Sequence, residues 1–361
     1  MNTVLVGAYA HRMRHRVTLV VLAAAFACND STAPSPEFDA EAANATAQNV
    51  AASLGENEAL RILDVLGTRM ALRVPGTGLL MATTPFVPER TGDGAWLGDR
   101  ATLLGATADP AVLIPGDLLG KTLVYNPATQ RYEVDDERDG APSAGVRFVL
   151  YAVDPVMHRI VSPLQEIGFL DLVDESTPSA DRLAITASVH DVVLLDYEAA
   201  ASIGVVGGIT LTFTAVGSVG NGDDQLAFDL RQELSEASGL ELDYLIGHAG
   251  DANVRLQVSA ASPASVSLSL TVEDGPGRII LSVTQTENAL EGAVRFNGEV
   301  VVQIAGTSTE PVFTDAAGNP LGARERRALR ELIAFTGALL TLIEHLLRPA
   351  HNFLSIPVLT L

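Results

Sequence analysis

Apolar side chains recur at every second position from Leu183 onward, and this alternation constrains the fold more than any other feature of the chain. Ile209, Leu211 and Phe213 alternate with threonines, and further segments of roughly six to ten residues repeat the pattern. Turn-forming residues separate the segments. This arrangement predicts an antiparallel meander over residues 181–315, with one apolar face and one face rich in serine and threonine. About eight such strands would curl, because β-sheets twist.

A C-terminal helix is expected to cover the apolar face of that sheet. The predicted helix occupies residues 320–348, begins near Ala323 and ends at Pro349, and residues 349–361 would form a tail. Leucine and isoleucine occupy most of its circumference, so it is predicted to be long and apolar over most of its girth. The fold class that follows is mainly β (α+β): a large curved antiparallel β-meander packed on a long apolar C-terminal helix.

The chain ahead of the meander is expected to be less regular. Ser35-Pro36-Glu37 supplies an N-cap, a first-turn proline and an acidic first turn, which predicts a short helical N-terminal segment over residues 37–68. Residues 69–180 are predicted to form an irregular region with β-hairpins, because glycine and proline are frequent there.

Two turns in this irregular region share one pattern. Asn126-Pro127 and Asp154-Pro155 each precede an arginine by the same spacing, and both pairs suit the first two positions of a type I turn. Apolar or aromatic segments flank each turn, so two hairpins are predicted. The shared pattern is either a weak internal repeat or two independent uses of common turn chemistry.

The N-terminus has the features of a bacterial export signal. Three arginines at positions 12, 14 and 16 precede an apolar run from Val17 to Phe26, and small residues lead to Cys28. The segment Ala25-Phe26-Ala27-Cys28 resembles the lipobox of bacterial lipoproteins, although Phe26 departs from its usual small or polar residue. Residues 1–27 are therefore interpreted as a signal peptide. The compact signal that starts after Met13 suggests that Met13 is the initiator.

The resemblance implies that Cys28 becomes the lipidated first residue of the mature protein, carrying diacylglyceryl and palmitate-type chains. Cys28 is the only cysteine of the chain, so no intramolecular disulfide is possible. Residues 28–36 are polar and proline-bearing, as in a flexible tether. The family's sorting rule, with Asn29 rather than aspartate after the cysteine, points to the outer membrane over the inner one. The alternative is an ordinary secretory signal with an incidental cysteine.

Few residue patterns in the chain are typical of catalytic or metal sites. Asp135-Asp136-Glu137-Arg138-Asp139-Gly140 resembles the start of a calcium loop, but Val146 occupies the position where an EF-hand requires glutamate. A solvated acidic loop is the alternative. The histidines of the mature chain match no metal or catalytic spacing; they are His158, His190, His248, His345 and His351. Lys121, the only lysine, and Trp96, the only tryptophan, have no assignable role. No catalytic, cofactor-binding or metal residue is therefore predicted.

The net negative charge of the chain excludes some classes of binding partner. The chain has 23 basic and 44 acidic residues, and loss of the three arginines before Cys28 takes the net charge from −21 to −24. Such a surface repels nucleic acid and anionic headgroups. We therefore expect an envelope lipoprotein, attached to the membrane through Cys28, that acts as a non-catalytic structural or protein-interaction module. A carrier of a hydrophobic ligand such as a lipid is the alternative, and an enzyme is a third.

Overall fold

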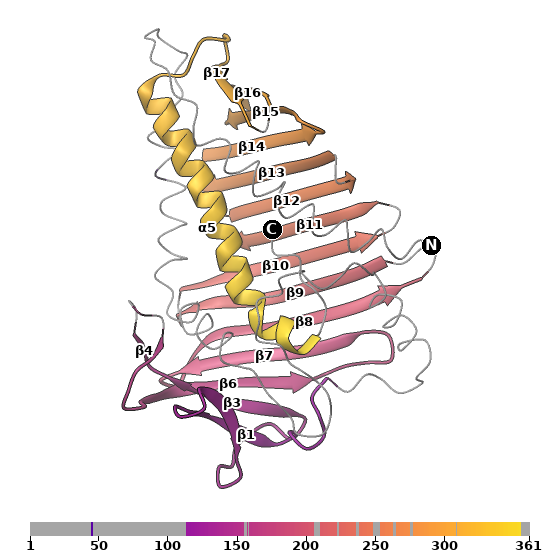
Figure 1. Ribbon diagram of the computed structural model, residues 1–361, viewed down its shortest axis with the longest axis vertical. Coiled ribbons are helices and arrows are strands. Elements are labelled where there is room, and N and C mark those ends of the chain that lie inside the picture. Colours follow the sequence, from indigo (N-terminus) through magenta and orange to yellow (C-terminus); the bar gives the residue numbers. More distant parts are fainter. Residues whose placement is uncertain are drawn as a thin grey trace.

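The computed structural model describes residues 113–354, except for 155–156, 158, 206–209, 222–223, 236–237, 248–252, 263–264, 275–276 and 308, together with residue 45. Apart from that one residue, the predictions for the signal peptide, Cys28, the tether, the helical segment 37–68 and Trp96 lie outside the described residues. The described part is mainly β, which confirms the predicted fold class (Figure 1). Within it, no helix is long and apolar enough to cross a lipid bilayer.

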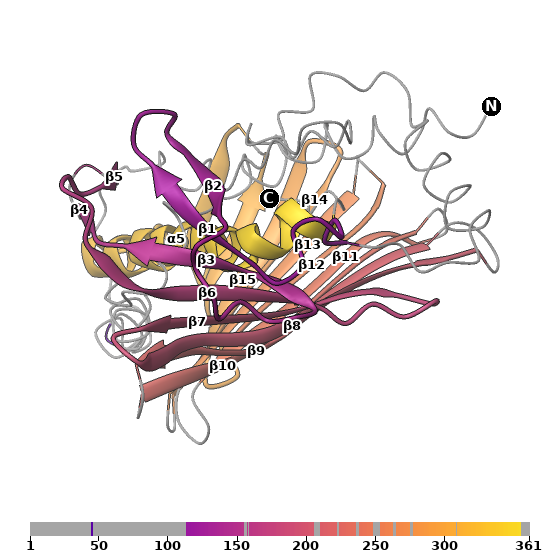
Figure 2. The same cartoon turned by 90° about the horizontal axis from the view of Figure 1, so that it is seen from below.

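Fifteen strands form one open sheet that twists and curves (Figure 2). From β6 to β17 each strand is antiparallel to the next one in the chain, which is the predicted meander. The strands are β1 (Lys121–Asn126), β2 (Arg131–Asp135), β3 (Gly145–Tyr151), β4 (Val153–Asp154), β5 (Arg159–Ile160), β6 (Glu166–Asp174), β7 (Asp181–Val189), β8 (Val192–Gly204), β9 (Thr210–Asn221), β10 (Asp224–Ser235), β11 (Gly239–Gly247), β12 (Asn253–Ser262), β13 (Ser265–Asp274), β14 (Gly277–Thr286), β15 (Ala289–Phe296), β16 (Glu299–Gly306) and β17 (Pro311–Asp315).

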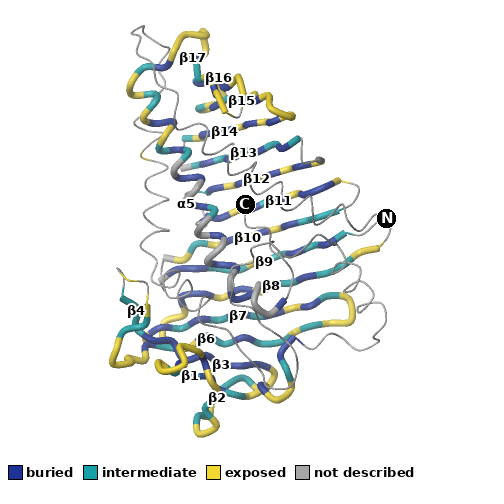
Figure 3. Tube along the Cα trace, viewed as in Figure 1, coloured by how far each residue is buried: buried dark blue, intermediate teal, exposed yellow. Residues whose placement is uncertain are grey.

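Tight turns and side-chain alternation fix the register of the meander. His190 and Asp191, which join β7 to β8, have φ angles of 49° and 64°, as a two-residue type I′ hairpin turn requires. Along most strands of the meander, buried and more exposed residues alternate (Figure 3). The buried side chains are mainly apolar, so one face of the sheet is apolar and the other is polar. A shift of one residue would exchange the two faces, and the register is therefore strongly specified.

The sheet extends further toward the N-terminus than the predicted 181–315. β1 and β2 form the first predicted hairpin, but β3 pairs with β1 in parallel and with β6 in antiparallel orientation. The second predicted hairpin survives only as the two-residue pairing of β4 with β5. The second hairpin is shorter than predicted because β3 is buried along almost its whole length, which is typical of a central strand and not of an exposed hairpin. The two turns do not occupy equivalent places in the fold.

Helix α5 (Ala323–Leu354) runs across the strands on the apolar side of the sheet (Figures 1 and 2). It begins at the predicted residue, where the Glu325 carboxylate accepts a hydrogen bond of 2.6 Å from the Gly322 amide. The predicted end at Pro349 is wrong, because the helix continues to Leu354. Ala350 and Leu354 are completely buried, and burial of apolar surface offsets the cost of a proline inside the helix.

The helix is amphipathic and is not apolar around most of its girth. Arg324, Arg327 and Arg330 are exposed in its first turns, whereas Ala328 and Leu329 are buried. The buried residues of the helix belong to one hydrophobic cluster with the apolar face of the sheet. The helix therefore serves as the predicted cover, but it presents a charged outer surface.

Tyr197 connects the sheet to the C-terminal half of α5. Tyr197 of β8 and Phe228 of β10 each lie directly opposite Gly217 of β9, one on either side. Their rings meet edge to face with centroids 5.6 Å apart. The Tyr197 hydroxyl donates a hydrogen bond of 3.0 Å to the backbone carbonyl of Leu346 in α5. Gly217 leaves the space that this contact occupies.

Candidate functional site: a polar groove on the open face of the sheet

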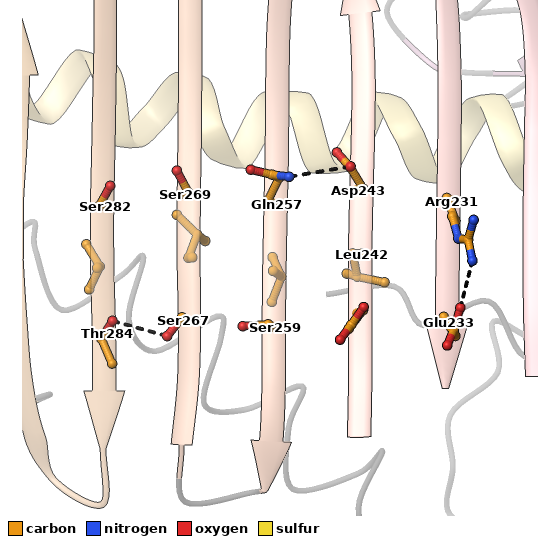
Figure 4. A pocket seen from close by; sticks show the side chains of 14 residues that line it. Arg231, Glu233, Leu242, Asp243, Gln257, Ser259, Ser267, Ser269, Ser282 and Thr284 are labelled. Carbon is orange, nitrogen blue, oxygen red and sulfur yellow. Dashed lines mark hydrogen bonds and ion pairs between the residues drawn. The ribbon is translucent and has the colours of Figure 1, made fainter. Parts of the chain in front are cut away.

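The face of the sheet opposite α5 carries polar side chains on β10 to β14. In register, they form two rows that cross these five strands. Figure 4 shows these side chains in front of the strands, with the helix behind. The first row consists of Arg231, Asp243, Gln257, Ser269 and Ser282, and the second consists of Glu233, Glu241, Ser259, Ser267 and Thr284.

The two rows line a shallow groove with a volume of about 610 Å³. We call this feature the polar groove. Its charge is uneven along its length: the ionisable side chains come from β10 and β11, whereas β12 to β14 contribute one amide and five hydroxyl groups. Small hydroxyl side chains leave the floor low, and the taller charged side chains form one end. The groove is therefore acidic at one end and neutral at the other.

Two of the carboxylates at the acidic end have arginine partners. The Glu233 carboxylate lies 2.8 Å from the guanidinium of Arg231, its neighbour on β10. Arg255 donates two hydrogen bonds, of 2.8 and 2.5 Å, to the Asp243 carboxylate. Glu241 is exposed and faces Glu233 directly across the two strands; it interacts electrostatically with Arg231, but within the described part of the chain it makes no hydrogen bond or ion pair. Like charges in that arrangement repel each other.

The neutral end of the groove is a ladder of hydroxyl groups. The hydroxyls of Ser267 and Thr284 are 3.1 Å apart and share a hydrogen bond. Ser269 and Ser282 are likewise cross-strand partners. Hydroxyl groups both donate and accept, so this part of the groove can satisfy either kind of polar group in a ligand.

The ion pair of Asp243 gives the groove a testable pH dependence. Hydrogen bonds from Arg255 lower the pKa of Asp243 below its ordinary value. Because both side chains are partly exposed, Asp243→Asn should lower the free energy of unfolding at pH 7 by only about 0.2–1 kcal/mol. That contribution is present above the unfolded-state pKa of about 4 and is lost as the pH falls through the lower folded-state value. Urea titrations at several pH values measure it.

Glu310→Gln, at an exposed turn outside the groove, is the control for removal of one negative charge. The difference between the wild type and Asp243→Asn should shrink as the pH falls below about 4, because Asp243 then becomes protonated in the unfolded state while it stays ionised in the folded state until the pH passes its lower pKa. A difference of the same size at pH 7 and pH 3 would mean that ionisation of Asp243 contributes nothing.

The acidic loop after β2, which resembled a calcium loop in the sequence, is held by basic side chains. Asp136 forms an ion pair of 2.6 Å with Lys121, and Asp135 forms one of 3.3 Å with Arg138. Arg138 also binds the Glu166 carboxylate and lowers its pKa. In the part of the chain that the structure describes, no group of three or more His, Cys, Asp or Glu residues could hold a metal ion. The described geometry thus agrees with an acidic loop in which the carboxylates are partly neutralised.

Of the histidines and the lysine considered in the sequence, the structure describes the side chains of His190 and Lys121. His190 lies in the turn between β7 and β8, and Lys121 begins β1. His158 and His248 lie outside the described residues, as do the side chains of His345 and His351. The polar groove was missed as a site because the sequence showed a face rich in serine and threonine without showing which side chains are neighbours. The positions of the turns between β10 and β14 determine which residues pair on adjacent strands, and they were the signal in the sequence that could have revealed the groove.

Comparisons with protein-family models, with curated proteins and with solved structures find no match to this chain.

Proposed function

We propose that this chain is an envelope lipoprotein, anchored to the membrane through acyl chains on Cys28, whose domain is a non-catalytic structural or protein-interaction module. The outer membrane is the proposed location, on the basis of Asn29. The observation that carries the proposal is that the two faces of the sheet differ in their surroundings. The apolar face shares one core with α5, and the opposite face presents the polar groove to solvent.

The polar face suits recognition because its side chains are held on a rigid frame. Adjacent strands fix the spacing of the groove residues, and ion pairs and hydrogen bonds orient several of them. A surface that is already ordered loses less conformational entropy when a partner binds. A protein partner of the cell envelope is therefore the proposed occupant.

A carrier of a hydrophobic ligand is the second candidate. The apolar face of the sheet continues to β16. The backbone of α5, in contrast, approaches β7 and β8 most closely. This difference in extent supports the carrier. A curved sheet whose apolar face receives an acyl chain would use this surface. We favour the interaction module, because the apolar side chains of the sheet and those of α5 form one buried cluster.

Site-specific photo-crosslinking in membranes tests the proposed function. The photoreactive amino acid p-benzoylphenylalanine is placed at Ser259, which is exposed and lines the polar groove. Illumination of cells that produce the full-length chain should give a discrete adduct of higher mass, because a partner bound at the groove lies within reach of the probe. Denaturing electrophoresis measures the adduct.

The matched control carries the same amino acid at Arg327, whose side chain is 74% exposed on α5. This position should give little adduct, since α5 lies on the other side of the sheet. If Ser259 and Arg327 give the same pattern, or if neither gives an adduct, the polar face is not the interaction surface.

A further inference from the structure

This inference rests on the proposed function and names the chemistry of the partner. We propose that the polar groove binds an extended, lysine- or arginine-bearing segment of a partner protein. A cationic side chain of that segment would lie at the acidic end, between Glu233 and Glu241, and the rest of the segment would follow the hydroxyl ladder toward β14.

The carboxylates of Glu233 and Glu241 provide the first argument. These residues are directly opposed on neighbouring strands, and such like-charge pairs are unfavourable in a sheet. Arg231 forms an ion pair with Glu233 and also interacts electrostatically with Glu241, but Glu241 has no ion pair of its own among the described residues. A cation placed between them would remove the repulsion and give Glu241 a partner. The charge-assisted hydrogen bonds formed in this way are stronger than those between neutral groups.

The charge balance of the groove provides the second argument. Its lining holds three carboxylates and one guanidinium, and Arg255 binds one of these carboxylates from outside the lining, so one negative charge stays uncompensated; the whole chain has a net charge of −21. The field of the groove and the field of the whole chain therefore have the same sign. Both attract a basic segment and repel an acidic one or a nucleic acid.

The shape and lining of the groove provide the third argument. Neighbouring strands are about 4.8 Å apart, so the distance from β10 to β14 is about 19 Å, which an extended segment of about six residues can span. The hydroxyls of Ser259, Ser269 and Ser282 can bind backbone or side-chain polar groups along that path. No aromatic side chain lines the groove, so it lacks the stacking surface on which bases bind.

A peptide-binding measurement tests this inference. The probe is a rhodamine-labelled peptide of alternating lysine and serine, six residues long, and its counterpart has glutamate in place of lysine. Fluorescence anisotropy is recorded with the full-length chain in detergent at low ionic strength, where screening is weak. The wild type should bind the lysine peptide, and the double variant Glu233→Gln, Glu241→Gln should bind it about tenfold more weakly. The glutamate peptide should not bind.

The matched control is Glu299→Gln with Glu310→Gln, which removes the same charge from exposed positions outside the groove. Its affinity should stay within about twofold of the wild type, because neither carboxylate lines the groove and neither can form an ion pair with a peptide bound there. Equal weakening in both double variants, or none in the groove variant, would overturn the inference. Circular dichroism establishes that each variant is folded. If the adduct from Ser259 persists while peptide binding is independent of the groove, only this inference fails, and the proposed function stands.

Discussion

Gly217→Val is expected to lower the free energy of unfolding by about 3–5 kcal/mol. A Cβ atom at this position would clash with the backbone carbonyl of Asp196 and with the side chain of Tyr197. Relief of the clash would separate the rings of Tyr197 and Phe228 and break the hydrogen bond from Tyr197 to α5. The loss therefore combines strain with the loss of an aromatic pair and of a buried hydrogen bond.

Gly116→Val is the matched control, because nothing lies within 4 Å of a Cβ atom at Gly116. It should change the free energy of unfolding by no more than about 0.5 kcal/mol. If the valine variant does not fold, Gly217→Ala can be measured in its place. It adds one carbon atom and should lower the free energy of unfolding by a smaller amount. Urea denaturation followed by circular dichroism provides the values. An unchanged midpoint for Gly217→Ala would show that the aromatic contact does not depend on the space at this glycine.

Cys28→Ser is expected to abolish incorporation of lipid into the chain completely. The cysteine sulfur is the acceptor that the lipobox resemblance implies, and no second cysteine could replace it. A single acyl chain contributes about 0.8 kcal/mol per buried CH₂ and anchors a protein only marginally, so stable attachment requires more than one chain. Metabolic labelling with alkynyl palmitate, followed by fluorescent detection on a gel, measures the incorporation.

Ser31→Ala, three residues further along the tether, is the control and should keep the full label. The ordinary secretory signal makes the opposite prediction for the wild type, namely a processed chain without label. An unlabelled wild-type chain would therefore contradict lipidation at Cys28, and a labelled Cys28→Ser chain would place the lipid elsewhere.

The sequence was sufficient to predict the meander, since a period of two specifies both the strands and the face that each side chain occupies. Leu211 and Phe213 are buried as the alternation predicts. The same reasoning failed for β3, where both faces are covered and alternation disappears. It also placed the end of α5 at Pro349, because the local cost of proline was visible and the burial of Leu354 was not.

The polar groove was less accessible to sequence reasoning than the fold. Glu233 and Glu241 are separated by a turn, and their repulsion appears only when the register of β10 and β11 is known. The pairing of Asp243 with Arg255 depends on the next register in the same way. Alternation assigns a side chain to a face of the sheet, but it does not identify the neighbour on the adjacent strand. That information resides in the length and geometry of each turn.

If the apolar face of the sheet is filled by the chain's own core, it has no room for a ligand, and the polar face is the functional surface. Native mass spectrometry of the mature lipidated chain that begins at Cys28, released from detergent, tests this claim most directly. The predicted result is the mass of the polypeptide with its covalent acyl chains and nothing further. A second, non-covalent lipid that remains bound at one copy per chain after detergent exchange would contradict the claim and establish the apolar face as a ligand site.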